Sequence, residues 1–167
     1  MTTLFAGKYF SILTDSDGTE FVRTGDEVLI VALSEQDEVL LIKEPSPAFG
    51  VQTLVLPGGS TEDDEEFSVT ANRELQEEVG LRAAQFDYLG ELRAFSKYLT
   101  VRSHVYLARQ LSASQLKGDE DYEIEVSRVS LKDFEAMIED KRLMDARVIT
   151  ALYLARAFID SEAGLSV

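Results

Sequence analysis

The chain has 167 residues, of which 45% are hydrophobic and 28% charged, proportions typical of a globular domain. Its net charge of -15 argues against a general nucleic-acid binder, because such proteins neutralise phosphates with clustered lysines and arginines. The absence of cysteine excludes disulfides, thiolate metal sites and cysteine nucleophiles. No apolar run approaches the roughly 18 residues that span a bilayer, and the N-terminus lacks a signal-peptide pattern. We therefore predict one cytoplasmic domain over residues 1–167, without a membrane partner.

The N-terminal third of the chain predicts β-strands separated by turns. The pair Asp17-Gly18 is typical of a hairpin. Extended apolar runs cover residues 8–13, 20–23, 27–33 and 39–42. Because proline lacks the donor that a central strand needs, we expect a loop to begin at residues 44–47. A strand over residues 53–56 is then expected to stop at a turn, Pro57-Gly58-Gly59.

The first predicted helix follows that turn. Apolar residues recur every fourth position, which predicts an apolar ridge along about four helical turns: Phe67, Ala71, Leu75 and Val79. Asp63 or Asp64 is expected to cap its start, and Gly80 to follow its end.

The rest of the chain predicts further strands and two more helices. Ser130 is expected to cap a helix over residues 131–138. Strands are expected over residues 86–94, 99–108 and 124–129, with a polar loop over 112–122 and an amphipathic helix over about 146–159. Strands flanked by helices predict an α/β fold, with a sheet between helices.

Three glutamates share one face of the first predicted helix. Glu74, Glu77 and Glu78 have the spacing i, i+3, i+4, so their side chains project together. Like charges this close destabilise a helix by roughly a few tenths of a kcal/mol per pair. They form either a solvated acidic face or a site for a hard cation such as Mg²⁺, which prefers oxygen ligands.

The spacing around these glutamates favours the cation site. Gly59, Glu65, Arg73-Glu74-Leu75, Glu77-Glu78 and Gly80-Leu81 fill every specified position of the pattern G-x5-E-x7-R-E-U-x-E-E-x-G-U. On this pattern the chain resembles the Nudix hydrolases, which cleave nucleoside diphosphates linked to another group. The resemblance implies the Nudix-type α/β/α sandwich, with a mixed sheet between helices.

The resemblance also implies roles for residues of the box. Glu74 and Glu78 correspond to the main Mg²⁺ ligands, with Mn²⁺ as a substitute, and Glu77 and the Gly58 carbonyl to supporting ligands. Arg73 would orient Glu65 and neighbouring carboxylates. Gly58 and Gly59 would let the backbone approach the substrate phosphates. A metal-activated water would then attack one phosphorus of the pyrophosphate.

Outside the box, the chain resembles the ADP-ribose pyrophosphatase and ADP-compounds hydrolase branch, through residues 116–120 and 139–154. In that branch a loop glutamate can activate the water. Glu120 is the first candidate and Glu123 the second; a box glutamate is a third, and either loop acid could be merely solvated. Two positions depart from the branch pattern: Ser96 replaces a proline, and Leu54-Val55 replace an aromatic-glutamate pair.

Several residues on the strand pair after the box are candidates for substrate contact or are surface residues: Arg93, Lys97, Tyr98 and Arg102. We expect His104, the only histidine, to be structural, and Phe95 and Tyr106 to lie in the core.

The predicted function is Mg²⁺-dependent hydrolysis of an ADP-containing small molecule such as ADP-ribose, reduced NAD or a diadenosine polyphosphate. One alternative is a Nudix-fold nucleotide-sensing or regulatory protein without turnover, and another is a merely acidic structural domain. The resemblance also implies a homodimer, with the strands at about residues 5–23 as a dimerisation hairpin.

Overall fold

The computed structural model describes residues 1–62, 64–118 and 124–164. Its strands form three sheets, with the orders β1-β2-β3, β10-β5-β6 and β7-β4-β9-β8. The strands are β1 (Thr2–Ala6), β2 (Ser11–Thr14), β3 (Glu20–Arg23), β4 (Glu27–Ala32), β5 (Glu38–Ser46), β6 (Val51–Val55), β7 (Gly58–Ser60), β8 (Leu81–Leu92), β9 (Ser103–Ala113) and β10 (Glu125–Ser130). The helices are α1 (Phe67–Glu78), α2 (Phe134–Glu139) and α3 (Ala146–Glu162).

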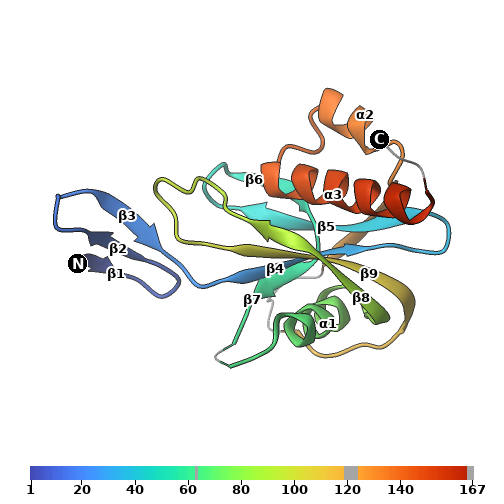
Figure 1. The fold of residues 1–167 in the computed structure, drawn as a ribbon, viewed down its shortest axis with the longest axis horizontal. Coiled ribbons are helices and arrows are strands. Elements are labelled where there is room, and N and C mark those ends of the chain that lie inside the picture. Colours follow the sequence, from blue (N-terminus) through green and yellow to red (C-terminus); the bar gives the residue numbers. More distant parts are fainter. Residues whose placement is uncertain (63, 119–123, 165–167) are drawn as a thin grey trace.

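The helices cover the strands from two sides (Figure 1). Helix α1 lies on one side of the β7-β4-β9-β8 sheet, and α2 and α3 lie on the other side of the strands. That sheet is mixed, since β4 and β9 run parallel while its other pairs are antiparallel. The predicted α/β/α sandwich is therefore confirmed.

Two apolar clusters hold these layers together. Alternate residues of β4 point to opposite faces of the sheet, as a strand requires. Val28 and Ile30 pack with Ala71 and Leu75 of α1. Leu29 and Val31 belong to the larger cluster, which includes residues of β5, α2 and α3. Strand β4 is thus buried on both faces and joins the two halves of the core.

The N-terminal sheet, β1-β2-β3, extends from one end of the molecule (Figure 1). Every residue of β1 is exposed. The links between this sheet and the rest of the chain include hydrogen bonds from Val22 N to Tyr98 O (2.7 Å) and from Thr100 N to Val22 O (3.0 Å). These bonds join β3 to the connection between β8 and β9.

Two predictions about strand ends are wrong. Strand β5 continues through Pro45, which pairs with Gln52 of β6. In the described residues β10 pairs with β5 only as far as Lys43, so Pro45 lies beyond that pairing, where its missing donor is tolerated. The expected turn at Gly58-Gly59 is instead the start of β7, which pairs with β4.

The predictions of helix starts are also partly wrong. The residue at the α1 N-cap is Glu66, without a side-chain capping bond, so Asp64 does not cap this helix; Asp63 lies outside the described residues. Helix α2 begins at Phe134 after Asp133, and Ser130 therefore does not cap it. Gly80 follows α1 with φ +71°, which agrees with the prediction for the helix end.

Strands β8 and β9 are longer and begin and end elsewhere than expected. They leave residues 93–102 as their connection, whereas residues 112 and 113 belong to β9. Phe95 in this connection is 67% exposed, so its assignment to the core is wrong. Tyr106 is partly buried against the α1-side cluster. None of the helices in the described ranges has an apolar stretch long enough to span a bilayer.

Candidate metal and phosphate site

The candidate site lies where the backbone of β7 meets the acidic face of α1. Gly58 N donates a hydrogen bond of 2.9 Å to Oε2 of Glu78. Gly59 lies so close to Glu74 that a Cβ atom at Gly59 would be 2.5 Å from Oε1 of Glu74. Real Cβ atoms do not approach an oxygen this closely, so the glycine makes room for the carboxylate.

A glycine is required at position 58 because of its contact with β4. A Cβ atom there would lie 2.1 Å from the backbone oxygen of Val28 on β4. Backbone cannot yield as a flexible side chain can, so any larger residue would push β7 away from β4. The two glycines of the box therefore serve two different contacts, one with the sheet and one with the helix.

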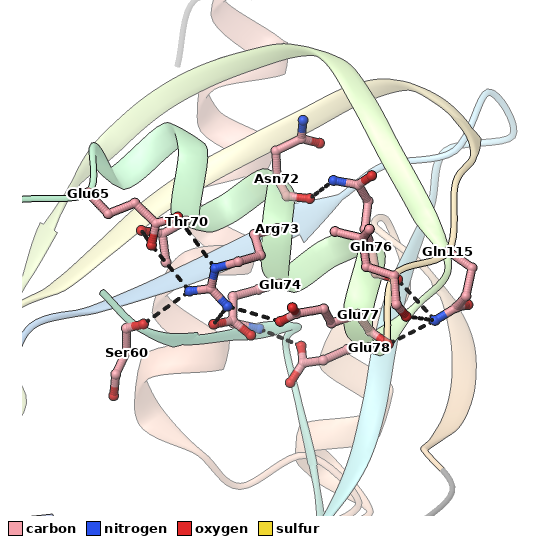
Figure 2. Close-up of polar contacts among 12 residues, drawn as sticks. Ser60, Glu65, Thr70, Asn72, Arg73, Glu74, Gln76, Glu77, Glu78 and Gln115 are labelled. Carbon is pink, nitrogen blue, oxygen red and sulfur yellow. Dashed lines mark hydrogen bonds and ion pairs between the residues drawn. The ribbon is translucent and has the colours of Figure 1, made fainter. Parts of the chain in front are cut away.

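Arg73 holds three carboxylates in one network (Figure 2). Its Nη1 donates to Oε1 of Glu74 at 2.8 Å and to Oε2 of Glu77 at 2.9 Å. Its Nε and Nη2 donate to Glu65 at 3.4 and 3.3 Å. Nη2 also lies 3.5 Å from the backbone oxygen of Ser60 at the end of β7. The guanidinium therefore offsets much of the repulsion among the glutamates.

These contacts shift the protonation equilibria of the pair Arg73 and Glu65. The Arg73 guanidinium holds the pKa of Glu65 below its ordinary value, outweighing the opposing effect of burial, and the Thr70 hydroxyl adds to the shift. Burial lowers the pKa of Arg73, but hydrogen bonds and attraction to Glu65 and Glu74 outweigh it and raise that pKa. Both groups therefore remain charged at neutral pH.

The two carboxylates nearest β7 are well removed from solvent. Glu74 is 8% exposed and Glu78 is 6% exposed. Buried charges of this kind require compensation by partners or by a metal ion. The two side chains lie one helical turn apart and offer only oxygen donors, which fits a hard divalent cation.

Among the residues that the structure describes, no group of three or more acidic or histidine side chains forms a ready metal cluster. Mg²⁺ in phosphate-processing sites usually takes one or two carboxylates, with substrate oxygens and waters completing its shell. The pair Glu74 and Glu78 meets that requirement without a third side chain.

The structure does not place the predicted substrate-binding residues on paired strands. Arg93, Tyr98 and Arg102 all lie in the connection between β8 and β9. Arg93 donates to Glu91, and Arg102 donates to both oxygens of Asp26. In the described ranges, the hydrogen bonds and ion pairs of these three residues do not include a box carboxylate. Glu120 and Glu123, the candidate bases, lie outside the described residues.

Sequence reasoning missed residues that support the site from outside the box pattern. Thr70 is fully buried, and its hydroxyl donates to Glu65 at 2.8 Å. Gln115 follows β9 and donates to backbone oxygens at the end of α1 (Figure 2). The place of Thr70 one helical turn before Glu74 is a local signal for its contact with the site, whereas nothing in the sequence near Gln115 indicates a contact with α1.

His104 packs under the start of α1. It is 6% exposed, its ring stacks on Phe67 at a centroid distance of 3.7 Å, and Nδ1 lies 3.2 Å from the Tyr88 hydroxyl. These contacts connect α1 to β8 and β9 and agree with a structural role.

Comparison with known proteins places this site in a family. The NUDIX domain family matches residues 23–152 of the chain. The chain belongs to the Nudix family. The matched residues include the whole box and run from before β4 into the first half of α3. The assignment to the Nudix family, which the box pattern predicted, is therefore confirmed.

Curated relatives extend this result over most of the chain. An ADP-ribose pyrophosphatase of Bacillus subtilis is 26% identical over 89% of this chain and 86% of its own length. The ADP compounds hydrolase NudE of Escherichia coli is 27% identical over 83% of this chain and 75% of its own length. A solved structure of an ADP compounds hydrolase superposes with a TM-score of 0.82 at 26% identity, covering 99% of this chain and 94% of that one. The prediction of a Nudix hydrolase is confirmed.

One relative is named for regulation. A methanol dehydrogenase activator of Bacillus methanolicus is 25% identical over 80% of this chain and 73% of its own length.

Proposed function

We propose that the protein is a Mg²⁺-dependent pyrophosphohydrolase of ADP-containing compounds, such as ADP-ribose, reduced NAD or diadenosine polyphosphates. The observation that carries the proposal is the pair of buried carboxylates, Glu74 and Glu78, against the Gly58-Gly59 backbone. The names of two relatives, an ADP-ribose pyrophosphatase and an ADP compounds hydrolase, support the substrate class.

Each residue of the site has a proposed role. Glu74 and Glu78 would hold the cation, with support from Glu77 and the Gly58 carbonyl, and Mn²⁺ would substitute for Mg²⁺. Arg73 orients the Glu74 and Glu77 carboxylates through its hydrogen bonds and holds the pKa of Glu65 below its ordinary value. A bound divalent cation supplies charge neutralisation at the phosphate oxygens and an activated water. Gly59 lets the Glu74 carboxylate lie against the backbone of β7, where a Cβ atom would collide with it.

The residues that select the substrate are expected outside the box. Val55 lies in the core at 9% exposure, so this position carries an apolar side chain where the branch pattern has a glutamate. Contacts with substrate therefore fall to other groups, and we propose Arg93, Tyr98 and Arg102 for them. These three residues lie in the connection between β8 and β9, which is hydrogen-bonded to β3. Most residues of this connection are exposed, so a substrate can reach it from solvent.

A substrate panel tests the proposal. Purified protein is incubated with Mg²⁺ and ADP-ribose, NADH, diadenosine polyphosphates and nucleotide sugars, and AMP or phosphate release is measured. Wild-type protein should release AMP from at least one ADP compound, and Glu78→Gln should not. No turnover of any compound, or equal turnover by the variant, would exclude the proposed reaction.

The same panel assigns the base. Glu120→Gln should lower kcat and remove the ascending limb of the pH profile, while leaving the half-saturating Mg²⁺ concentration unchanged. If Glu123→Gln does so instead, the second candidate is the base. If neither does, a box glutamate takes this role.

A second function is favoured by one relative. Because a methanol dehydrogenase activator is similar over 80% of the chain, a regulatory role toward another enzyme is an alternative. The two proposals differ in their dependence on turnover. A regulator without turnover would bind an ADP compound in calorimetry and release no AMP from it.

We also propose a homodimer within a single-domain architecture, with the N-terminal sheet at the interface. Large apolar side chains are exposed on and beside β1: Leu4, Phe5, Tyr9 and Phe10. Light scattering should give twice the mass of 18.6 kDa, and Phe5→Asp with Phe10→Asp should give a monomer. The proposed cytoplasmic location can be checked by imaging a tagged chain.

A further inference from the structure

A short segment after β9 is bound to the end of the metal-site helix. Ser114 N donates to the Gly80 oxygen at 2.9 Å, and Leu116 N donates to the Gln76 oxygen at 3.2 Å. The Ser114 hydroxyl donates to Oε1 of Gln76 at 2.7 Å. Gln115 Nε2 donates to the backbone oxygens of Gln76 and Glu77, both at 3.1 Å (Figure 2).

The bonds from Leu116 N and from Gln115 Nε2 satisfy backbone carbonyl groups that α1 cannot satisfy itself. The last four C=O groups of an α-helix have no partner within it. In α1 these groups include the oxygens of Gln76 and Glu77, and no basic residue lies in the last turn. The Gln115 amide therefore takes the place that a lysine or arginine often has at a helix end.

A neutral donor suits this helix end for an electrostatic reason. The helix dipole places partial negative charge at the C-terminal turn, where Glu77 and Glu78 add two full charges. Arg73 already contacts Glu77 from the preceding turn, and a second lysine or arginine at the helix end would compete further with a divalent cation for these carboxylates. An amide satisfies the carbonyls and leaves the negative charge available to the metal.

The glycine after the helix preserves this arrangement. Gly80 has φ +71°, a conformation that side chains rarely adopt. A Cβ atom at Gly80 would also lie 2.4 Å from Oε1 of Gln115. The residue at this position of the box thus provides both the turn and the space for the amide.

We propose that Gln115 is a positioning residue for the metal-binding turn of α1. By holding the carbonyls of Gln76 and Glu77, it fixes the backbone from which Glu77 and Glu78 project. This inference rests on the proposed metal-dependent function and deepens it, since it assigns a determinant of metal affinity outside the Nudix box.

The test compares Gln115→Met with Gln85→Met. Methionine keeps the length of the side chain and removes its donors. Gln85 is a matched control, because its amide is also hydrogen-bonded: its Nε2 donates to the Asp87 carboxylate on β8, and its Oε1 accepts from Gln110. Three quantities are measured: the half-saturating Mg²⁺ concentration for turnover, Mn²⁺ affinity by calorimetry without nucleotide, and hydrogen exchange of amides 75–80.

Gln115→Met should weaken both metal affinities by about three- to tenfold, as expected for the loss of one or two hydrogen bonds. It should speed amide exchange at the helix end, while kcat at saturating Mg²⁺ stays within about threefold of wild type. Gln85→Met should resemble wild type in all three. Gln115→Glu, which keeps the shape but adds negative charge without donors, should speed exchange at least as much.

Unchanged metal affinity and unchanged exchange in Gln115→Met would overturn the inference while leaving the proposed function intact. An equal loss of metal affinity in Gln85→Met would overturn it too, since the effect would then be general. If wild-type protein neither binds Mn²⁺ nor hydrolyses any ADP compound, the proposed function itself fails. The two failures are therefore distinguishable.

Discussion

Gly59 on β7 and Glu74 on α1 approach each other so closely that a methyl group on the glycine would overlap the carboxylate, with Oε1 at 2.5 Å. The two residues are fifteen positions apart in the sequence and belong to different elements. The strand backbone thus forms one wall of the proposed cation site, and the helix supplies the opposite wall.

This contact predicts that Gly59→Ala lowers activity without unfolding the protein. The new methyl group must displace the Glu74 side chain, so we expect kcat/KM to fall by at least about tenfold, or roughly 1.4 kcal/mol. Gly25→Ala is the matched control, because no heavy atom lies within 4 Å of a Cβ atom there. Kinetics and circular dichroism of both variants test this, and equal activities would show that Glu74 moves aside freely.

Removal of either proposed metal ligand should lower activity far more than Gly59→Ala does. Glu74→Gln and Glu78→Gln keep the shape of the side chain and remove a charge, so each should lower kcat by about three orders of magnitude or more, roughly 4 kcal/mol. The steady-state rate at saturating Mg²⁺ is the measurement. A loss below about tenfold for either variant would mean that this carboxylate does not hold the cation.

Replacement of Arg73 by lysine should change the pKa of Glu65. A single ammonium cannot contact Glu65, Glu74 and Glu77 together, as the planar guanidinium does. The pKa of Glu65 should therefore rise toward its ordinary value of 4.5. Carboxyl carbon chemical shifts across a pH titration measure it. Arg82→Lys, which changes a bond to Ser112 on the sheet, should leave the Glu65 titration as in wild type.

Asp145 and Asp133 offer a matched pair for stability. Asp145 caps α3 by accepting from the backbone N of Arg147 and Val148, whereas Asp133 precedes α2 without a side-chain capping bond. Asp145→Ala should lower the free energy of unfolding at pH 7 by about 1–2 kcal/mol. Asp133→Ala should change it by less than about 0.5 kcal/mol. Urea unfolding of both variants gives the comparison.

The Asp145 contribution should also depend on pH. Burial raises the pKa of this carboxyl, but hydrogen bonds and attraction from Arg147 outweigh it and lower the pKa below 3.8. A depressed pKa stabilises the folded state at pH values above the ordinary pKa, and this stability is lost as the pH falls through the folded value. The difference between wild type and Asp145→Ala should therefore be full at pH 6 and shrink below about pH 4. A difference that stays constant into acid would contradict the role of the ionised carboxyl.

The sequence predicted the layers of the fold and the acidic face of α1, because these depend on local periodicity and on a spacing within one helix. It did not predict β7, because a Pro-Gly-Gly segment indicates a turn unless its pairing partner is known. The partner, β4, lies some thirty residues earlier, and a pairing of that kind leaves no local signal.

The ends of elements were the other source of error. Pro45 was expected to stop β5, but its position past Lys43, the last residue paired with β10, removes the reason to stop. Similarly, Arg93 and Arg102 were predicted to lie on paired strands. Strand β8 ends at Leu92 and β9 begins at Ser103, so both arginines lie in the connection between them. The contact of Gln115 with α1 arises only when β9 returns beside the helix, so periodicity could not indicate it.

Because Gly58 and Gly59 belong to the edge strand β7, which is paired with β4, and Glu74 and Glu78 belong to a helix packed on the same sheet, the proposed site has no hinge of its own. Its geometry persists only while β4, β7 and α1 remain packed together. Heat inactivation should consequently follow the same temperature curve as the loss of secondary structure, rather than preceding it as in enzymes whose active-site loops melt first.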